Sequence, residues 1–295
     1  EAAAMAGLTN DIVSTERLET GILAGLTVGT AFLVLHGALG STFRQWGPRP
    51  TKVCKELQRK SFHMIGGCLI CAAYHWGIKH EYLTSAYLAE SRDYNSGQRR
   101  PMDGASAFVA ICFVSWTLEA SRLLFESVQK WYLRSFKGLI REKENNKAAG
   151  IAYFLPGSLA AMLAGPENLA VLGILFLSIG DAAASIGTAA GSLRVGSSSR
   201  MWEGSIGCFV VCTALAVYVG LALDVALVTA LLVTAGELLA EVIGLDDNLV
   251  IPMLGVMGVR IALAPQLPEM AAIMAVGLGI GVLLGVIVGA TTPAG

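Results

Sequence analysis

Asp181 is the residue of this sequence whose type and setting most clearly favour chemistry. It lies within the apolar segment 175–187, with Gly180 before it and Gly187 closing the segment. An ionisable side chain inside a membrane-spanning segment costs about 2.5–3.5 kcal/mol, and residues that persist there commonly serve function. We therefore predict that Asp181 acts in catalysis or binds a metal ion. The alternative is a structural ion pair with a buried Arg or Lys.

A basic cluster stands at the entrance to the apolar segment 62–78. Arg59 and Lys60 lie four and three positions before His63, so the three side chains can share one face of a helix. Arg binds phosphate as a planar fork and Lys as a point charge. The cluster is therefore predicted to contact a phosphorylated ligand. The alternative is a basic anchor at the membrane surface, with an ordinary packed histidine.

Two other segments carry basic residues next to glycine. Arg141 and Lys143 belong to a mixed-charge run that ends shortly before Gly150 and the following apolar segment. They are candidates for nucleotide binding, although a solvated helix end also explains the run.

The second segment runs from Arg200 to Ser205, where an apolar helix is expected to begin. A helix N-terminus attracts anions, and Gly204 would let a phosphate approach the backbone closely. Arg200 and Ser205 could contact the same phosphate. Glu203 could hold a metal ion or simply cap the helix.

Acidic residues gather near the end of the apolar segment 225–243. Glu237 and Glu241 are four positions apart and share a helical face, and an Asp-Asp-Asn sequence follows at 246–248. Asp246, Asp247 and Asn248, together with Glu237, offer oxygen ligands that suit Mg²⁺ or Ca²⁺. The alternative is that the Asp-Asp-Asn sequence is a turn between two helices.

Composition places these clusters in a membrane. The chain has 295 residues, of which 54% are hydrophobic and 15% charged, with a mean hydropathy of +0.62. A soluble domain carries roughly 25% charged residues. The net charge of −1 gives no attraction to nucleic acid, so we expect no nucleic-acid partner. Six cysteines include one CxxC inside an apolar run, without the second ligand pair of a zinc site, and indicate buried free thiols.

The elements that would position the clusters are helices, because a spanning backbone must satisfy its own hydrogen bonds. We predict an all-α, polytopic transmembrane bundle of about nine spans, in which the long apolar stretch 206–240 divides near Gly220–Asp224 into two spans. Two short segments contain Pro156 and Pro252. Residues 1–20 are interpreted as a few residues left over from cloning, followed by an extramembrane N-terminal segment. Residues 21–295 are interpreted as one transmembrane domain. The apolar segments are 21–39, 62–78, 104–118, 151–165, 169–190, 205–221, 225–243, 249–264 and 271–290.

The distribution of basic residues predicts the orientation. With the loop 40–61 in the cytoplasm, fifteen Lys and Arg residues lie inside and five lie outside, while Arg260 falls within a span. This bias follows the positive-inside rule. The N-terminus is then outside, the C-terminus is cytoplasmic, and all five clusters lie at the cytoplasmic ends of spans.

The order and spacing of the motifs resemble those of the family of dolichol kinases, phytol kinases and CTP-dependent diacylglycerol kinases, which is related to phosphatidate cytidylyltransferases. The resemblance runs from about Glu56 to Pro252. The matching elements are Arg59-Lys60-x-x-His63, Glu119-x-x-Arg122, Arg141–Glu144 with Gly150, Gly180-Asp181, Glu203-Gly204-Ser205 and Asp246-Asp247-Asn248.

The resemblance implies transfer of the γ-phosphate of CTP to the hydroxyl of a membrane lipid alcohol, with a divalent cation. Arg59 and Lys60 would hold phosphate, and Asp181 would bind metal or accept the hydroxyl proton. Residues 203–205 would line the phosphate site and residues 246–248 the metal. Arg200 stands where the family usually has Lys. Some motifs are more similar to dolichol kinases and others to diacylglycerol or phytol kinases, so the alcohol stays open, as does homo-oligomer formation.

Expected locations come from the same resemblance. The endoplasmic reticulum, with the site facing the cytoplasm, suits dolichol and diacylglycerol kinases, whereas a plastid envelope suits phytol kinases; a bacterial inner membrane is a further possibility. Two other functions stay open. One is an enzyme that makes a CDP-lipid, and the other is a transporter that uses Asp181, Glu237 and Glu241 as an ion path.

Overall fold

A computed structural model describes residues 13–79, 102–136, 140, 144–195 and 199–263. Within these ranges the chain is helical, and the one β feature is an isolated antiparallel bridge between Arg194 and Met201. The prediction of an all-α fold is therefore confirmed for the described part of the chain. The expected segment 271–290 lies outside the described residues.

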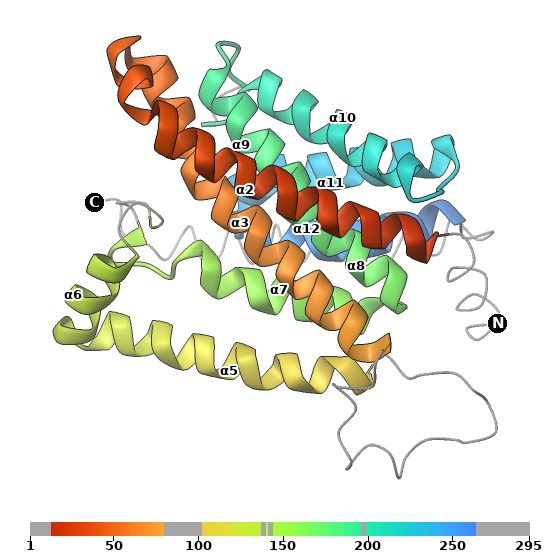
Figure 1. The fold of residues 1–295 in the computed structure, drawn as a ribbon. Coiled ribbons are helices and arrows are strands. Elements are labelled where there is room, and N and C mark those ends of the chain that lie inside the picture. The colour runs from red at the N-terminus through yellow and green to blue at the C-terminus, as the bar shows by residue number, and fades with distance from the viewer. Residues whose placement is uncertain (1–12, 80–101, 137–139, 141–143, 196–198, 264–295) are drawn as a thin grey trace.

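The described part of the chain is a succession of helices (Figure 1). Helices α8, η2 and α9 form one continuous rod, and η2 is a π-helical turn within it. The elements are α2 (Thr15–Gln45), α3 (Pro48–Lys79), α5 (Met102–Leu124), α6 (Glu126–Ser135), α7 (Gly150–Ala164), α8 (Glu167–Leu175), η2 (Phe176–Gly180), α9 (Asp181–Ala190), α10 (Trp202–Tyr218), α11 (Leu223–Ile243) and α12 (Asp247–Leu263).

The first eight expected apolar segments each coincide with a helix or, for 169–190, with the α8–η2–α9 rod. The expected break between the sixth and seventh segments falls at Gly220, where φ is +109° and the chain turns from α10 into α11. Glycine adopts this backbone conformation without the clash that a Cβ would cause. Pro156 and Pro252 lie within continuous helices, α7 and α12.

Three helices are long and apolar enough to cross a membrane. They comprise Thr15–Phe43, Glu167–Ala190 and Leu223–Ala240. A fourth candidate is the pair Phe108–Leu124 and Glu126–Ser135, which bends by 116° at its break. Large apolar side chains also remain exposed on the outer helices, among them Phe113, Leu124 and Val34. The chain therefore has the helices and the apolar surface of a membrane protein.

The α8–η2–α9 rod forms the centre of the bundle. From Asn168 to Leu175 every side chain of α8 is buried, and the rod contacts α2, α3, α7, α10 and α12 (Figure 1). The apolar side chains buried around it form one continuous core that extends into α3, α7, α10, α11 and α12. Because the rod carries Asp181, the fold places that carboxylate in the interior of the protein.

Glycines bring α10 close to the rod. A Cβ built on Gly187 would lie 2.7 Å from the carbonyl oxygen of Glu203, and one built on Gly204 would lie 2.5 Å from the carbonyl oxygen of Ala184. A Cβ on Gly180 would lie 2.4 Å from Cys212 Sγ. Small residues permit such close approach of helices in membranes. These three glycines are therefore explained by helix packing before any ligand is considered.

A buried arginine joins the end of α5 to the chain before α7. The Arg122 side chain is fully buried, and its Nε and Nη2 donate to the two carboxylate oxygens of Glu119 at 2.9 and 2.6 Å. Its guanidinium also donates to the carbonyl oxygens of Asn145, Glu144 and Lys147, while Glu119 accepts from the backbone N–H of Ala149. This network positions the start of α7.

A second buried ionic group lies where α2 begins, α3 ends and α8 begins. His75 Nε2 lies 3.2 Å from Glu19 Oε1, and His75 Nδ1 lies 2.6 Å from Glu167 Oε1. A carboxylate thus lies beside each ring nitrogen, and the Nε2 contact has the geometry of a hydrogen bond. His75 thereby links three helices.

Replacing His75 with glutamine is expected to lower the free energy of unfolding by roughly 1.5–3 kcal/mol, because contacts between the imidazole and two carboxylates are lost. Thermal unfolding of the purified protein in nanodiscs measures the change. Glu126→Gln is the matched control, since Glu126 pairs with Lys130 on an exposed surface, where such pairs contribute about 0–1 kcal/mol. Equal stability of the two variants would contradict a structural role for His75.

Candidate functional site

Asp181 follows a π-helical turn in the central rod. At the end of η2 the backbone N–H of Asp181 donates to the carbonyl oxygen of Phe176, five residues earlier. A π turn inserts one residue into an α-helix and rotates the later residues about the helix axis, and such turns are frequent at functional sites. The turn therefore sets the direction in which the Asp181 side chain leaves the rod.

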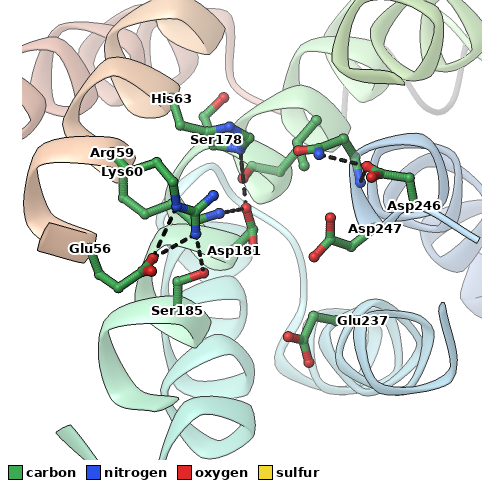
Figure 2. Close-up of polar contacts among 12 residues, drawn as sticks. Glu56, Arg59, Lys60, His63, Ser178, Asp181, Ser185, Glu237, Asp246 and Asp247 are labelled. Carbon is green, nitrogen blue, oxygen red and sulfur yellow. Dashed lines mark hydrogen bonds and ion pairs between the residues drawn. The ribbon is translucent and has the colours of Figure 1, made fainter. Parts of the chain in front are cut away.

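The Asp181 carboxylate meets two side chains of α3. Lys60 Nζ donates to Asp181 Oδ2, and His63 Nε2 lies 3.2 Å from the same oxygen (Figure 2). Lys60 and Asp181 are 2% and 0% exposed, so this ion pair is sealed from solvent. His63 also packs edge-to-face on Phe154 of α7, with ring centroids 4.7 Å apart. Residues predicted from two separate motifs thus form one buried group.

Arg59 lies at the margin of this group. Its Nε and Nη2 donate to Glu56 Oε2 at 3.1 and 2.6 Å, and Nη2 also lies 3.4 Å from Ser185 Oγ on α9 (Figure 2). The side chains of Arg59 and Glu56 are 18% and 24% exposed, unlike the sealed Lys60. Arg59 is therefore the more accessible of the two predicted phosphate ligands.

A second ionic group joins the chain before α10 to α11 and α12. Arg200 Nη1 lies 2.6 Å from Glu237 Oε1, and Arg200 Nη2 donates to Asp247 Oδ2 at 2.7 Å. Figure 2 shows the Glu237 and Asp247 side chains extending from their helices toward the part of the bundle that contains Asp181. Arg200 thus brings together the predicted phosphate ligand and two predicted metal ligands.

Asp246 and Asn248 interact with each other next to this group. Asn248 donates to Asp246 Oδ1 from its backbone N–H at 3.0 Å and from its side-chain Nδ2 at 2.6 Å. Asp246 lies in the connection between α11 and α12. Burial, with the adjacent Asp247 carboxylate adding to it, raises the pKa of Asp246 to about 6. The Asp246 carboxyl therefore takes up a proton more readily than an exposed aspartate does.

Several acceptor oxygens in these groups lack a hydrogen-bond donor. They are Asp181 Oδ1, Glu237 Oε2 and Asn248 Oδ1, all buried. Oxygen acceptors without donors are the chemical type of ligand that Mg²⁺ and Ca²⁺ take. However, within the described ranges no three His, Cys, Asp or Glu side chains are grouped closely enough to hold a metal ion. The oxygen atoms are therefore of the type that binds a metal cation. In the structure, the positive charge beside them comes from Arg200 and Lys60.

Other predicted site residues have structural contacts. Glu203 accepts hydrogen bonds from the backbone N–H groups of Ser192 and Leu193, so it holds the connection between α9 and α10. These contacts differ from the predicted helix cap, because Met201 is the N-cap residue of α10 and no described side chain caps that helix. Ser205 is buried at the start of α10, and its Oγ has no hydrogen-bond partner. Arg141 and Lys143 lie outside the described residues.

The structure also adds residues that the sequence motifs did not single out. Ser185 contacts Arg59, Phe154 contacts His63, and Glu56 neutralises Arg59. Glu56 lies three positions before Arg59 and Ser185 four after Asp181, so helical spacing was the available signal. No signal in the sequence pointed to Phe154, because an aromatic residue in an apolar helix is ordinarily part of the core.

The contacts of the predicted site residues thus form two ionic groups in an apolar bundle, one centred on Asp181 and one on Arg200. Both contain a cation that could move to a phosphate and a carboxylate that could accept a proton or a metal ion. No protein-family model matches the chain, and neither does any curated protein or solved structure.

Proposed function

We propose that this chain is an integral-membrane lipid kinase that transfers the γ-phosphate of CTP to the hydroxyl of a membrane lipid alcohol, such as diacylglycerol, dolichol or phytol. The observation that carries the proposal is the buried Lys60–Asp181–His63 group on α3 and α9. It supports the proposal because phosphoryl transfer needs held phosphates, neutralised charge and an aligned alcohol more than covalent chemistry. The choice of CTP rests on the motif resemblance.

In the proposed reaction Asp181 accepts the proton of the lipid hydroxyl as that oxygen attacks the γ-phosphorus. His63 and Lys60 hold the carboxylate in place, because both contact Asp181 Oδ2. Arg59, at the accessible margin, would bind the phosphates of the nucleotide. Arg200 would leave Glu237 and Asp247 to contact the same phosphates. The bond from phosphorus to the β–γ bridging oxygen breaks, and CDP leaves.

A divalent cation is part of the proposal. Glu237 and Asn248 would hold it, because each has a buried oxygen without a hydrogen-bond donor. The carboxylates of Asp246 and Asp247, which now accept hydrogen bonds from Asn248 and Arg200, would complete the ligand set. When bound, the cation would neutralise charge on the phosphates. Mg²⁺ and Ca²⁺ both prefer such oxygen ligands.

The membrane arrangement that we propose has about nine spans, an outside N-terminus and a cytoplasmic C-terminus. It is supported by the excess of Lys and Arg in the loops on the side of the two ionic groups. The site would then face the cytoplasm, where CTP is available. We propose the endoplasmic reticulum as the compartment, with a plastid envelope or bacterial inner membrane as the other settings.

Incubation of the purified protein with γ-labelled CTP is expected to label a lipid. The panel comprises diacylglycerol, dolichol, phytol and farnesol, each with CTP or ATP and with Mg²⁺ or Ca²⁺. Thin-layer chromatography should reveal a labelled lipid phosphate that disappears when EDTA removes the cation. Formation of a CDP-lipid with release of pyrophosphate would instead identify a cytidylyltransferase. Solute flux into proteoliposomes without nucleotide, and no labelled lipid, would favour a transporter.

A further inference from the structure

A groove opens on the outer surface of the bundle between α5, α6 and α7. It has a volume of about 400 Å³, within the range of roughly 300–1,000 Å³ that is usual for small-molecule sites. Residues 110–119 of α5 form one wall, Ile151 and Ala152 of α7 form the other, and Tyr132 and Phe136 close the end at α6. Figure 1 shows α5 and α7 running alongside each other, with α6 turning across their ends.

The lining of the groove is suited to hydrocarbon. Ile111, Val114 and Ile151 expose 46%, 66% and 56% of their surface on this side of the protein. The charged residue among the lining residues is Glu119, and its carboxylate is already neutralised by Arg122. A ligand with charge of its own would therefore find no partner there, whereas a hydrocarbon chain would bury apolar surface at no polar cost.

Helix α6, at one end of the groove, has the features of a helix that lies at a membrane surface. The chain bends by 116° between α5 and α6, so α6 crosses the direction of the spanning helices. Helix α6 carries an exposed ion pair between Glu126 and Lys130. The neighbouring side chain of Trp131 is 54% exposed. Amphipathic helices with tryptophan and basic residues lie in the interface of a bilayer. A lipid chain in the groove would thus begin at the level where lipid head groups lie.

Helix α7 separates the groove from the two ionic groups by its own thickness. Ile151 and Ala152 line the groove, whereas the next turn contacts His63 through Phe154. At Gly150 a Cβ would lie 3.0 Å from Asn248 Nδ2, so the wall there consists of backbone alone. An α-helix with its side chains is about 10–12 Å in diameter. Helix α7 is thinner at Gly150, because glycine has no side chain.

We propose that this groove binds the hydrocarbon tail of the lipid alcohol substrate and leaves its hydroxyl free to pass the start of α7 toward Asn248 and Asp181. The inference rests on the proposed function for the identity of the lipid as substrate. It explains why the apolar opening and the ionic groups lie on the two sides of one short helix. Tail binding in the groove would set the depth of the hydroxyl in the bilayer.

A photoreactive lipid tests the inference on the full chain. The probe is a diacylglycerol with a diazirine in one acyl chain, incorporated into phosphatidylcholine vesicles that contain the protein, and the labelled peptides are identified by mass spectrometry. Labelling is expected to concentrate on residues 110–118 and 151–152. Filling the groove with Ser115→Phe should reduce that labelling roughly tenfold, because the aromatic ring would occupy the space of the hydrocarbon chain.

Val109→Phe is the matched control, because it adds similar bulk to a lipid-facing position of α5 that does not line the groove. It should leave the labelling unchanged. Ala110→Phe fills the groove from a second position and replaces Ser115→Phe if that variant does not fold. Even labelling along all lipid-facing helices would overturn the inference. So would specific cross-linking from the variant Ser115→Cys to residues 271–290, which would assign the groove to that segment of the chain.

Enzyme assays separate this inference from the proposed kinase. If the kinase assay is positive, Ser115→Phe should raise KM for the lipid roughly tenfold and leave KM for CTP unchanged. An active enzyme with unchanged lipid KM and even labelling would reject the groove and retain the kinase. Groove-specific labelling without any phosphate transfer would retain lipid binding and reject the kinase.

Discussion

Asp181→Asn is expected to reduce phosphate transfer by roughly 10²–10⁴-fold, the usual contribution of a general base. Asparagine has nearly the same shape but cannot accept the proton of the lipid hydroxyl. The assay is the initial rate of transfer from γ-labelled CTP to the lipid that proves active in the panel. Full activity in Asp181→Asn would show that the proposed site is wrong.

Loss of activity alone would not distinguish chemistry from folding, because Asp181→Asn leaves Lys60 buried without its counter-ion. Removing one partner of a buried ion pair typically costs about 3–5 kcal/mol, whereas replacing both by apolar residues is often neutral. The double variant Lys60→Met, Asp181→Leu should therefore recover the unfolding temperature without recovering transfer. If the double variant regains both, Asp181 has only a structural role.

Arg122→Met is expected to lower the free energy of unfolding by about 3–5 kcal/mol, the cost of removing one partner of a buried ion pair. The variant leaves the Glu119 carboxylate buried without Arg122 and removes the donors to the backbone carbonyls of residues 144, 145 and 147. Thermal unfolding in nanodiscs measures the change. Lys130→Met, on exposed α6, is the control and should change stability by less than about 1 kcal/mol.

Arg122→Lys tests the geometry of the same network. Lysine keeps the positive charge but cannot donate in the fork that reaches both oxygens of Glu119. Its stability should fall between that of the unaltered protein and that of Arg122→Met. If Arg122→Lys is as stable as the unaltered protein, charge alone accounts for the contribution of Arg122.

The positions of the helices were predictable because they depend on local sequence. A run of apolar residues bounded by charges or turn-forming residues predicts a helix, and each of the first eight segments overlaps one. The helix lengths were less predictable, because α2 and α3 extend to 31 and 32 residues through the polar sequence that flanks their apolar segments. The break at Gly220 was less certain, since the apolar composition continues through it. The conformation at this glycine, with φ at +109°, is a property of the turn rather than of the surrounding hydropathy.

Part of the candidate site was also predictable. A lone aspartate in an apolar segment predicts a buried partner or a function, and the sequence offered buried Lys or Arg as the partner. Asp181 has the buried partner, since it pairs with Lys60 and also contacts His63. Glu203 shows the limit of such reasoning, because a glutamate at the start of a helix suits both a cap and a metal ligand. The structure instead shows it accepting hydrogen bonds from the backbone of Ser192 and Leu193.

Which charges meet was decided by the assembled bundle. Lys60 and Asp181 are 121 residues apart, and Arg200 contacts Asp247 across 47 residues. Such pairings depend on how far each helix is rotated about its axis, and the π turn before Asp181 changes that rotation within the rod. Local residue types therefore determine that this chain forms apolar helices with a few embedded charges. The packing of those helices selects the partners, because ion pairs form only between side chains that the fold brings within about 4 Å.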